Sequence, residues 1–164
     1  MSTPAPSPTI RALSPGDTGE VRALVLPELE QSRYPGAGRA ALDAVLDRTD
    51  PETRALVAVR EQRVVGVVIH GTIAGSMGAG RVQMVVIAPG SRRAGVATAL
   101  IDAALDDLRR TQVRFVIVEM PDDPELAPAM ALLDRTGFHT EARVSDFFRD
   151  GVDLAVFRRE LGGG

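Results

Sequence analysis

The chain has 164 residues, of which 45% are hydrophobic, enough for one domain with a sizeable apolar core. A formal net charge of −3 gives no sign of a surface for nucleic acid, and no apolar stretch is long enough to cross a membrane or to act as a signal segment, so we expect a cytoplasmic protein. Cysteine is absent, which excludes disulfides, thiolate metal ligands and a cysteine nucleophile, and all 19 basic residues are arginines.

The first third of the chain predicts a tail, a strand and two helices. Residues 1–8 are rich in proline and serine and predict a disordered tail. A strand is expected over 9–13, and a helix over about 18–29 with its apolar residues on one face. A break at 32–38 contains two glycines and a proline, and a second helix is expected over 40–46.

Two strands are predicted next, over 54–60 and 63–72. The second strand is apolar on both faces from 64 to 69, so we expect it at the centre of a sheet that is covered on both sides. His70 ends this strand, and its two candidate roles are a buried structural histidine and a contact at the site. A flexible loop is expected around four glycines, Gly71, Gly75, Gly78 and Gly80; it lacks the Gly-Lys-Ser/Thr ending of a phosphate loop and precedes a strand.

A strand over 82–87 then runs into a glycine-containing loop and a long amphipathic helix. Apolar residues share one helix face, and Ser91 is the expected N-cap. Arg92 and Arg93 stand at the positive end of the helix dipole, where two cations are unfavourable unless an anion binds between them. The stretch therefore has two interpretations: an anion-binding loop, or an ordinary connection whose arginines are solvated.

The last third predicts a strand over 112–120, a helix after Pro124 and a hairpin. Strand–helix–strand order favours a parallel pair formed by 82–87 and 112–120. Gly137 is the expected C-cap of the second helix, with Phe138 packing back on it. The hairpin is expected over 140–148 and 153–159, and 162–164 as a flexible end.

Two segments resemble the motifs of the GNAT acetyltransferase superfamily. Residues 92–97, Arg-Arg-Ala-Gly-Val-Ala, fit Arg/Gln-x-x-Gly-x-Gly/Ala directly after a strand that ends at a proline, which resembles the family's pyrophosphate loop. Residues 129–138, which close with Arg-Thr-Gly-Phe, resemble its second motif. The resemblance covers residues 9–161 and implies one α/β (α+β) domain with a central, mixed, twisted sheet of about six to seven strands, helices on both faces and a splayed strand pair.

The resemblance also implies acetyl-CoA as co-substrate, without a metal. The residues that it assigns to coenzyme A are Val85, Val86, Ile87, Arg92, Arg93, Ala94, Gly95, Val96, Ala97 and Thr98. A backbone N–H near Ile87 is a candidate donor to the oxyanion.

Three positions depart from the family pattern. The tyrosine commonly assigned to protonate the leaving thiolate is replaced by Leu133, and the asparagine six residues earlier by Ala127. Phe148 stands in the hairpin where related chains often carry a tyrosine. Direct attack of an amine on a thioester remains feasible, because water can protonate the thiolate.

Glu119, at the exit of an apolar strand, is the first candidate for the general base, and His70 is the second. The alternative for Glu119 is a rim carboxylate paired with an arginine. Tyr34, with Arg33 beside it, is a candidate contact to the acceptor. His70 is another candidate contact. The alternative for Tyr34 is an aromatic loop residue that packs on the nearest apolar surface.

Two functions fit these residues. The first is an N-acyltransferase that moves an acetyl group from acetyl-CoA to an amine of a small molecule or a peptide, with no nucleic-acid or membrane partner and with a homodimer possible. The second is a catalytically weak acetyl-CoA-binding sensor on the same fold, which the replaced tyrosine and asparagine favour.

Overall fold

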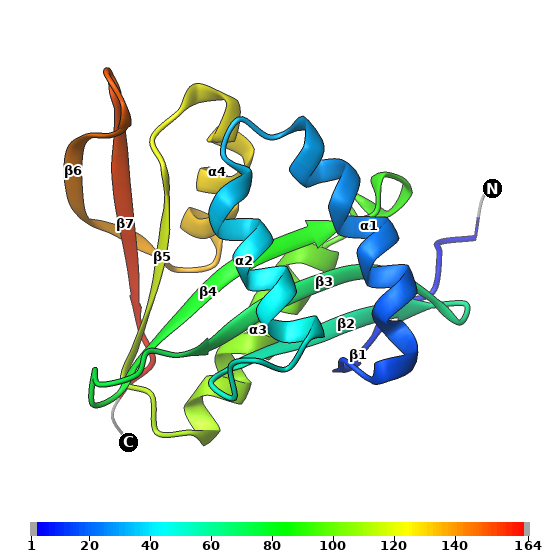
Figure 1. Ribbon diagram of the computed structural model, residues 1–164. Coiled ribbons are helices and arrows are strands. Elements are labelled where there is room, and N and C mark those ends of the chain that lie inside the picture. The colour runs from blue at the N-terminus through cyan, green and yellow to red at the C-terminus, as the bar shows by residue number, and fades with distance from the viewer. Residues whose placement is uncertain (1–2, 163–164) are drawn as a thin grey trace.

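A seven-stranded mixed sheet forms the centre of the computed structural model, which describes residues 3–162 (Figure 1). The strand order is β1-β2-β3-β4-β5-β7-β6. The strands are β1 (Thr9–Ala12), β2 (Thr53–Arg60), β3 (Arg63–Thr72), β4 (Ala79–Ile87), β5 (Phe115–Pro121), β6 (His139–Arg149) and β7 (Val152–Glu160). The four α-helices are α1 (Thr18–Gln31), α2 (Pro35–Leu46), α3 (Val96–Arg110) and α4 (Ala127–Arg135). The predicted class and strand number are confirmed.

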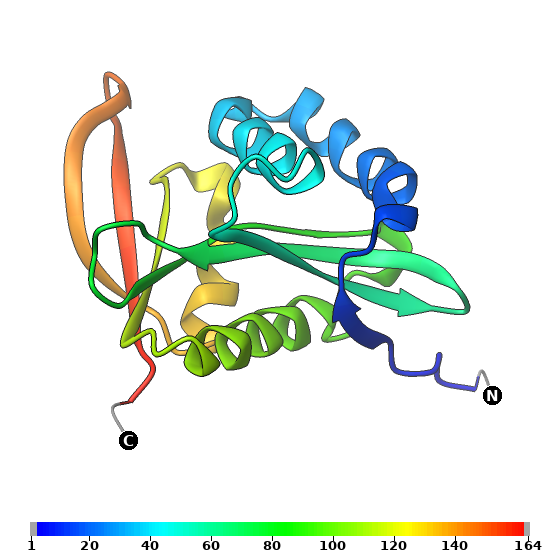
Figure 2. The same ribbon diagram turned by 60° about the horizontal axis from the view of Figure 1, so that its bottom comes forward.

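Helices cover both faces of the sheet, as Figure 2 shows, with α1 and α2 on one side and α3 on the other. Val67 and Ile69 of β3 pack into the core under α1 and α2, whereas Val68 packs into the core under α3. This alternation follows from the two-residue period of a strand. The prediction that β3 is central and covered on both sides is confirmed.

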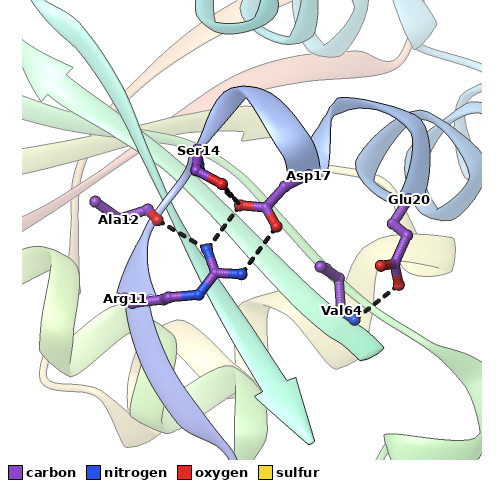
Figure 3. Close-up of polar contacts among 6 residues, drawn as sticks. All are labelled: Arg11, Ala12, Ser14, Asp17, Glu20 and Val64. Carbon is purple, nitrogen blue, oxygen red and sulfur yellow. Dashed lines mark hydrogen bonds and ion pairs between the residues drawn. The ribbon is translucent and has the colours of Figure 1, made fainter. Parts of the chain in front are cut away.

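A bidentate ion pair joins β1 to the start of α1 (Figure 3). Arg11 Nη1 and Nη2 donate to the Asp17 carboxylate at 2.7 and 2.9 Å, and the backbone N–H and the hydroxyl of Ser14 donate to the same group at 2.8 and 2.9 Å. Asp17 is buried, and the hydrogen bonds from Arg11 are the main reason that its pKa lies well below the ordinary value. In the next turn, Glu20 accepts a hydrogen bond from the N–H of Val64 at 3.0 Å, which ties α1 to β3.

Glycines explain the largest differences from the predicted elements. Helix α2 begins at Pro35 instead of residue 40, because Pro35 suits the first turn of a helix and Gly38 lies where a Cβ would come within 2.7 Å of Leu29. Gly71 and Gly80 lie inside β3 and β4 instead of in a loop. A Cβ on Gly71 would stand 2.1 Å from the carbonyl oxygen of Glu52, so this position needs glycine for close backbone approach.

The predicted tails lie partly outside the described residues. Residues 3–8 form no helix or strand, although the carbonyl of Pro6 accepts a hydrogen bond from Arg60 at 2.8 Å. Residues 1–2 and 163–164 fall beyond the described range. Within residues 3–162, none of the helices combines the length and the apolar character that a membrane crossing requires.

Candidate functional site

β4 and β5 are parallel and paired only near their beginnings. The register joins Ala79 to Phe115, Gly80 to Val116 and Arg81 to Ile117, and it stops there, although both strands continue. A register shift in the β3–β4 ladder lies at the same level, since Ile69 is opposite Met84 and His70 is opposite Val82. Gln83 is thus the extra residue of a bulge, and bulges bend a strand. The predicted splayed pair is present, and its open side exposes the edge of β4 from Gln83 onward.

Two cavities lie along this open edge. The loop cavity, about 330 Å³, lies against the second half of β4 and the start of α3. The hairpin cavity, about 310 Å³, lies where β4 and β5 part, beneath the β6–β7 hairpin. A larger cavity of about 600 Å³ lies at the β1–β2 edge, but it contains neither the loop before α3 nor the open edge of β4.

The loop cavity contains the start of α3. Gly95 is the N-cap of this helix, with φ of 74°, and not Ser91 as predicted. Ser91 is buried at the end of a short 3-10 turn (Pro89–Ser91), and the chain then needs a left-handed residue to enter the helix, which glycine adopts without strain. The first bond of the helix runs from the N–H of Ala99 to the carbonyl of Gly95 at 3.0 Å. The N–H groups of the preceding first turn therefore point out of the helix end, as an anion site requires.

Every residue predicted to bind coenzyme A lines the loop cavity except Ala94, which lies outside its wall. Arg92 donates to Glu28 at 2.6 Å and to the carbonyl of Ile87 at 3.3 Å, which holds its guanidinium beside the open edge. Arg93 is exposed, and its φ of 63° is unusual for a residue with a side chain. The wall of the loop cavity also contains residues that were not predicted to belong to it: Glu28 of α1 and Pro128, Ala129, Leu132 and Arg135 of α4.

Backbone groups of β4 face the gap between the splayed strands. The N–H of Ala88 donates to Val65 of β3 at 2.9 Å. Because successive N–H groups of a strand alternate between its two edges, those of Ile87 and Val85 point away from β3, toward the gap. The carbonyl of Ile87 faces the same way, since Arg92 reaches it from that side.

Glu119 lies on β5 in the wall of the hairpin cavity. It is exposed, and among residues 3–162 it makes no side-chain hydrogen bond or ion pair. The alternative of a rim carboxylate paired with an arginine is thus not what the structure contains. Apolar side chains form most of this cavity: Ala37, Ile73, Val82, Ile117, Phe147, Phe148 and Leu154. Arg81 and Gln83 complete it, and none of these was predicted as a site residue.

Tyr34 lies at the rim of the hairpin cavity instead of in its wall. Its hydroxyl donates to Asp123 at 2.6 Å, and its ring meets Phe148 edge-on, with centroids 5.3 Å apart. Asp123 is only 4% exposed, and Arg149 and Arg33 lie 3.7 and 4.0 Å from its carboxylate. The hydrogen bond from Tyr34, followed by that from the N–H of Glu125, lowers the pKa of Asp123. Tyr34 thus connects the α1–α2 loop to the start of the α4 region and to the hairpin.

His70 lines neither cavity. Its side chain is fully buried on the α3 face of β3, and Nε2 lies 2.7 Å from Asp107 of α3. Burial lowers the pKa of His70 more than Asp107 raises it, so the ring is neutral at pH 7. This placement, away from both cavities, supports the structural role of His70 over a role as substrate contact or base. No cluster of three or more histidine, aspartate or glutamate side chains suited to a metal occurs among the described residues.

Comparisons with known proteins agree with this geometry. The model of the acetyltransferase (GNAT) family matches residues 21–138. No curated protein matches the sequence. Among solved structures, a GNAT-family protein from Desulfovibrio desulfuricans shares 23% identity and a TM-score of 0.84, with 95% of this chain and 100% of that chain covered.

Two further structures are similar in fold. A ribosomal-protein-alanine N-acetyltransferase from Brucella melitensis shares 19% identity and a TM-score of 0.74, with 93% of this chain and 99% of that chain covered. The protein yncA from Salmonella typhimurium, solved with acetyl-CoA, shares 17% identity and a TM-score of 0.76, with 97% of this chain and 96% of that chain covered.

Proposed function

The chain belongs to the GNAT acetyltransferase family, and from this premise we propose that it transfers the acetyl group of acetyl-CoA to an amine by direct attack. One observation carries the proposal. The loop cavity, with its unpaired helix amides and two arginines, and the hairpin cavity, where Glu119 lies, are lined by successive parts of the same strand, β4: the first by Val85 to Ile87 and the second by Arg81 to Gln83. A phosphate-bearing arm and an amine can thus approach one another from opposite ends of the same gap.

The loop cavity suits the pyrophosphate of coenzyme A. The N–H groups of Val96, Ala97 and Thr98, at the positive end of α3, would donate to phosphate oxygens, and Arg92 and Arg93 would add charge-assisted hydrogen bonds. Bound coenzyme A would supply the acetyl thioester. The two arginines at the helix start, unfavourable on their own, become favourable once an anion is bound.

The open edge of β4 provides the groups that orient the thioester. The N–H groups of Val85 and Ile87 both face the gap, and they differ in their distance from Glu119. Because Arg81 is level with Ile117, Gln83 is level with Glu119, and Ile87 lies four residues farther along, roughly 13 Å at the usual rise of a strand. Val85 lies about half as far. We therefore assign the oxyanion to the N–H of Val85, and to Ile87 the contact with the arm of the cofactor.

Glu119 is our candidate base. An unpaired carboxylate beside the gap can accept a proton from an ammonium group and leave the neutral amine to attack the carbonyl carbon. Leu133, at the position where related enzymes carry a tyrosine, is buried in the core and has no proton to give. The departing thiolate would take its proton from water.

The activity test is release of free coenzyme A from acetyl-CoA in the presence of amines, read with a thiol reagent; the enzyme contributes no background, because it has no cysteine. We expect release above the hydrolysis rate with at least one amine. Glu119→Gln should lower kcat/KM and remove the limb of the pH profile that the carboxylate sets, while acetyl-CoA still binds. An unchanged pH profile would reject Glu119 as the base.

The second candidate is an acetyl-CoA-binding sensor with weak catalysis. It is favoured by Leu133 and Phe148, which remove both tyrosines found in related enzymes. Turnover with any amine well above the rate of hydrolysis would reject it. Binding of acetyl-CoA without turnover across a broad panel of amines would favour it.

A further inference from the structure

We propose that the acceptor is a primary amine carrying an aromatic or similarly bulky apolar group, and that the hairpin cavity selects it. This inference rests on the proposed acetyl transfer and adds the class of acceptor. It is drawn from the chemistry of the cavity wall and from the way in which the chain presents two phenylalanines over it.

The hairpin cavity is an apolar space with a few polar groups on one side. Ile73, Ile117 and Leu154 contribute aliphatic wall, and the volume of about 310 Å³ suits a small molecule or one terminal residue of a peptide. The carboxylate of Glu119 is unpaired among residues 3–162, and Oε1 of Gln83 is buried without a hydrogen-bond partner there. The Glu119 carboxylate, which is exposed in the cavity wall, can accept an N–H group of an amine that enters the cavity.

The aromatic side of the cavity is built by an irregular segment of β6. Val144 pairs with Leu154 of β7, and the next paired residue is Arg149, opposite Val152, so residues 145–148 bulge out of the ladder. Asp146 adopts a φ of 51°, a conformation that residues other than glycine rarely take. Its backbone N–H donates to Asp153 at 3.0 Å, and its carboxylate accepts from the N–H of Gly151 at 2.7 Å, which fixes the bulge.

The bulge places Phe147 and Phe148 in the cavity wall although both remain exposed, at 57% and 38%. Their rings meet edge-on with centroids 5.0 Å apart, and Phe148 meets Tyr34 in the same way. Exposed phenylalanines add nothing to a core, and a strained turn has a cost, so their joint occurrence at a cavity indicates ligand binding. An aromatic group of the acceptor would pack against these rings edge-to-face.

The charges in the cavity wall favour an acceptor with one amino group over an acceptor with several. Arg81 lies in the same wall as Glu119, and its one ion pair among residues 3–162 is with Asp50, at 4.0 Å. A second ammonium group on the acceptor would meet this cation. Hydroxyl-rich acceptors would bring polar groups against apolar walls that offer them no partner. Polyamines and amino sugars are therefore disfavoured.

The test compares acceptors in the coenzyme A release assay with the full chain. The panel is phenethylamine, the peptides Phe-Gly-Gly and Ala-Gly-Gly, spermidine and an aminoglycoside. We expect kcat/KM for phenethylamine or Phe-Gly-Gly to exceed that for the other three by about tenfold or more. Preference for phenethylamine identifies a free small amine as the acceptor, and preference for Phe-Gly-Gly identifies a peptide terminus.

The double variant Phe147→Ala/Phe148→Ala should raise KM for the preferred aromatic amine about tenfold and leave KM for acetyl-CoA unchanged. Val144→Ala is the matched control, because Val144 is an exposed apolar residue of the same strand that lies outside the cavity. The control should change neither value.

Failure of this inference is distinct from failure of acetyl transfer. Equal or better turnover of spermidine or the aminoglycoside overturns the aromatic preference and leaves the transferase standing. If no amine is turned over, calorimetry with phenethylamine in the presence of coenzyme A decides. Binding that the double variant weakens supports the hairpin cavity as a site for aromatic amines and favours the sensor over the transferase, whereas absence of binding overturns the inference.

Discussion

The two halves of the sheet are built differently. From β1 to β4 the strands are antiparallel neighbours joined along most of their length, and helices cover both faces. From β5 onward the sheet meets β4 through only three residue pairs, and every residue of β6 is exposed. The first half and its helices carry most of the buried core, whereas the second half adds Val116, Ala155 and Phe157 to it and carries the irregular bulge and the aromatic wall of the hairpin cavity.

This difference separates two tasks. Stability depends mainly on the β1–β4 half, where a change in a side chain disturbs close packing. Choice of the acceptor depends, in our proposal, on exposed side chains of the β5–β7 half, above all Phe147 and Phe148, which can change at small cost to stability. The loop cavity lies at the border and is built from both, since β4 and α4 each form part of its wall.

The strongest test of this separation is a substitution that creates a void in the core of the first half. Leu100 is fully buried between α3 and β3, so Leu100→Ala should reduce the free energy of unfolding by about 2–5 kcal/mol, from lost apolar contact and the void that remains. Urea unfolding followed by circular dichroism measures this. A loss below about 1 kcal/mol would mean that the half does not carry the core as described.

The ion pair at the start of α1 should have the next largest effect. Arg11→Ala leaves the buried Asp17 carboxylate without its main partner and should cost about 1–3 kcal/mol at pH 7. In the native protein the lowered pKa of Asp17 adds stability that is fully present above its ordinary value of 3.8 and is lost as pH falls below that value. Arg11→Ala should flatten this loss between about pH 4 and pH 2. An acid-unfolding curve of unchanged slope would contradict it.

Arg92 and Arg93 lie at the border between the halves. Arg92→Glu combined with Arg93→Glu should weaken acetyl-CoA binding at least tenfold, about 1.4 kcal/mol. The free energy of unfolding should change little. Calorimetry measures the affinity. The matched control is Arg22→Glu combined with Arg63→Glu, which reverses the charge of two arginines outside both cavities. These arginines pair with Asp47 and Glu20. Equal weakening by both double variants would show a general charge effect and reject the phosphate site.

The smallest effect is expected in the second half. Val144→Ala removes an exposed side chain from β6 and should change the free energy of unfolding by less than about 0.5 kcal/mol. The same urea experiment measures it beside Leu100→Ala. A loss close to that of Leu100→Ala would erase the contrast between the halves.

The sequence predicted the regular parts of the fold well, because their periodicity is strong. Strands β2, β3 and β7 have the expected bounds to within one residue, and helix α3 is present as predicted, although its N-cap is Gly95 instead of Ser91. Glycines misled the prediction where packing decides. Gly38 and Gly80 suggest loops by propensity, but a helix and a strand use them for close approach to Leu29 and Val113.

A local motif sufficed to predict the candidate site in the loop from Arg92 to Thr98, whose residues, except Ala94, line the loop cavity. Elsewhere the site depends on contacts between residues distant in the sequence. Arg135 and Glu28 enter the loop cavity only through tertiary packing. Phe148 stood out as a missing tyrosine, but nothing in the local pattern indicates that a bulge at Asp146 turns it toward Tyr34. His70 carried no signal that would separate a buried partner of Asp107 from a site residue.

The hydrogen bonds that fix Asp146 have a consequence for how the protein can change. They run to Gly151 and Asp153, within the hairpin itself, so the turn is fixed locally, whereas Phe148 and Arg149 contact Tyr34 and Asp123 outside the hairpin. Substitutions at other positions of the bulge can therefore leave the turn intact. In our proposal, such changes would alter the choice of acceptor and leave the loop cavity as it is.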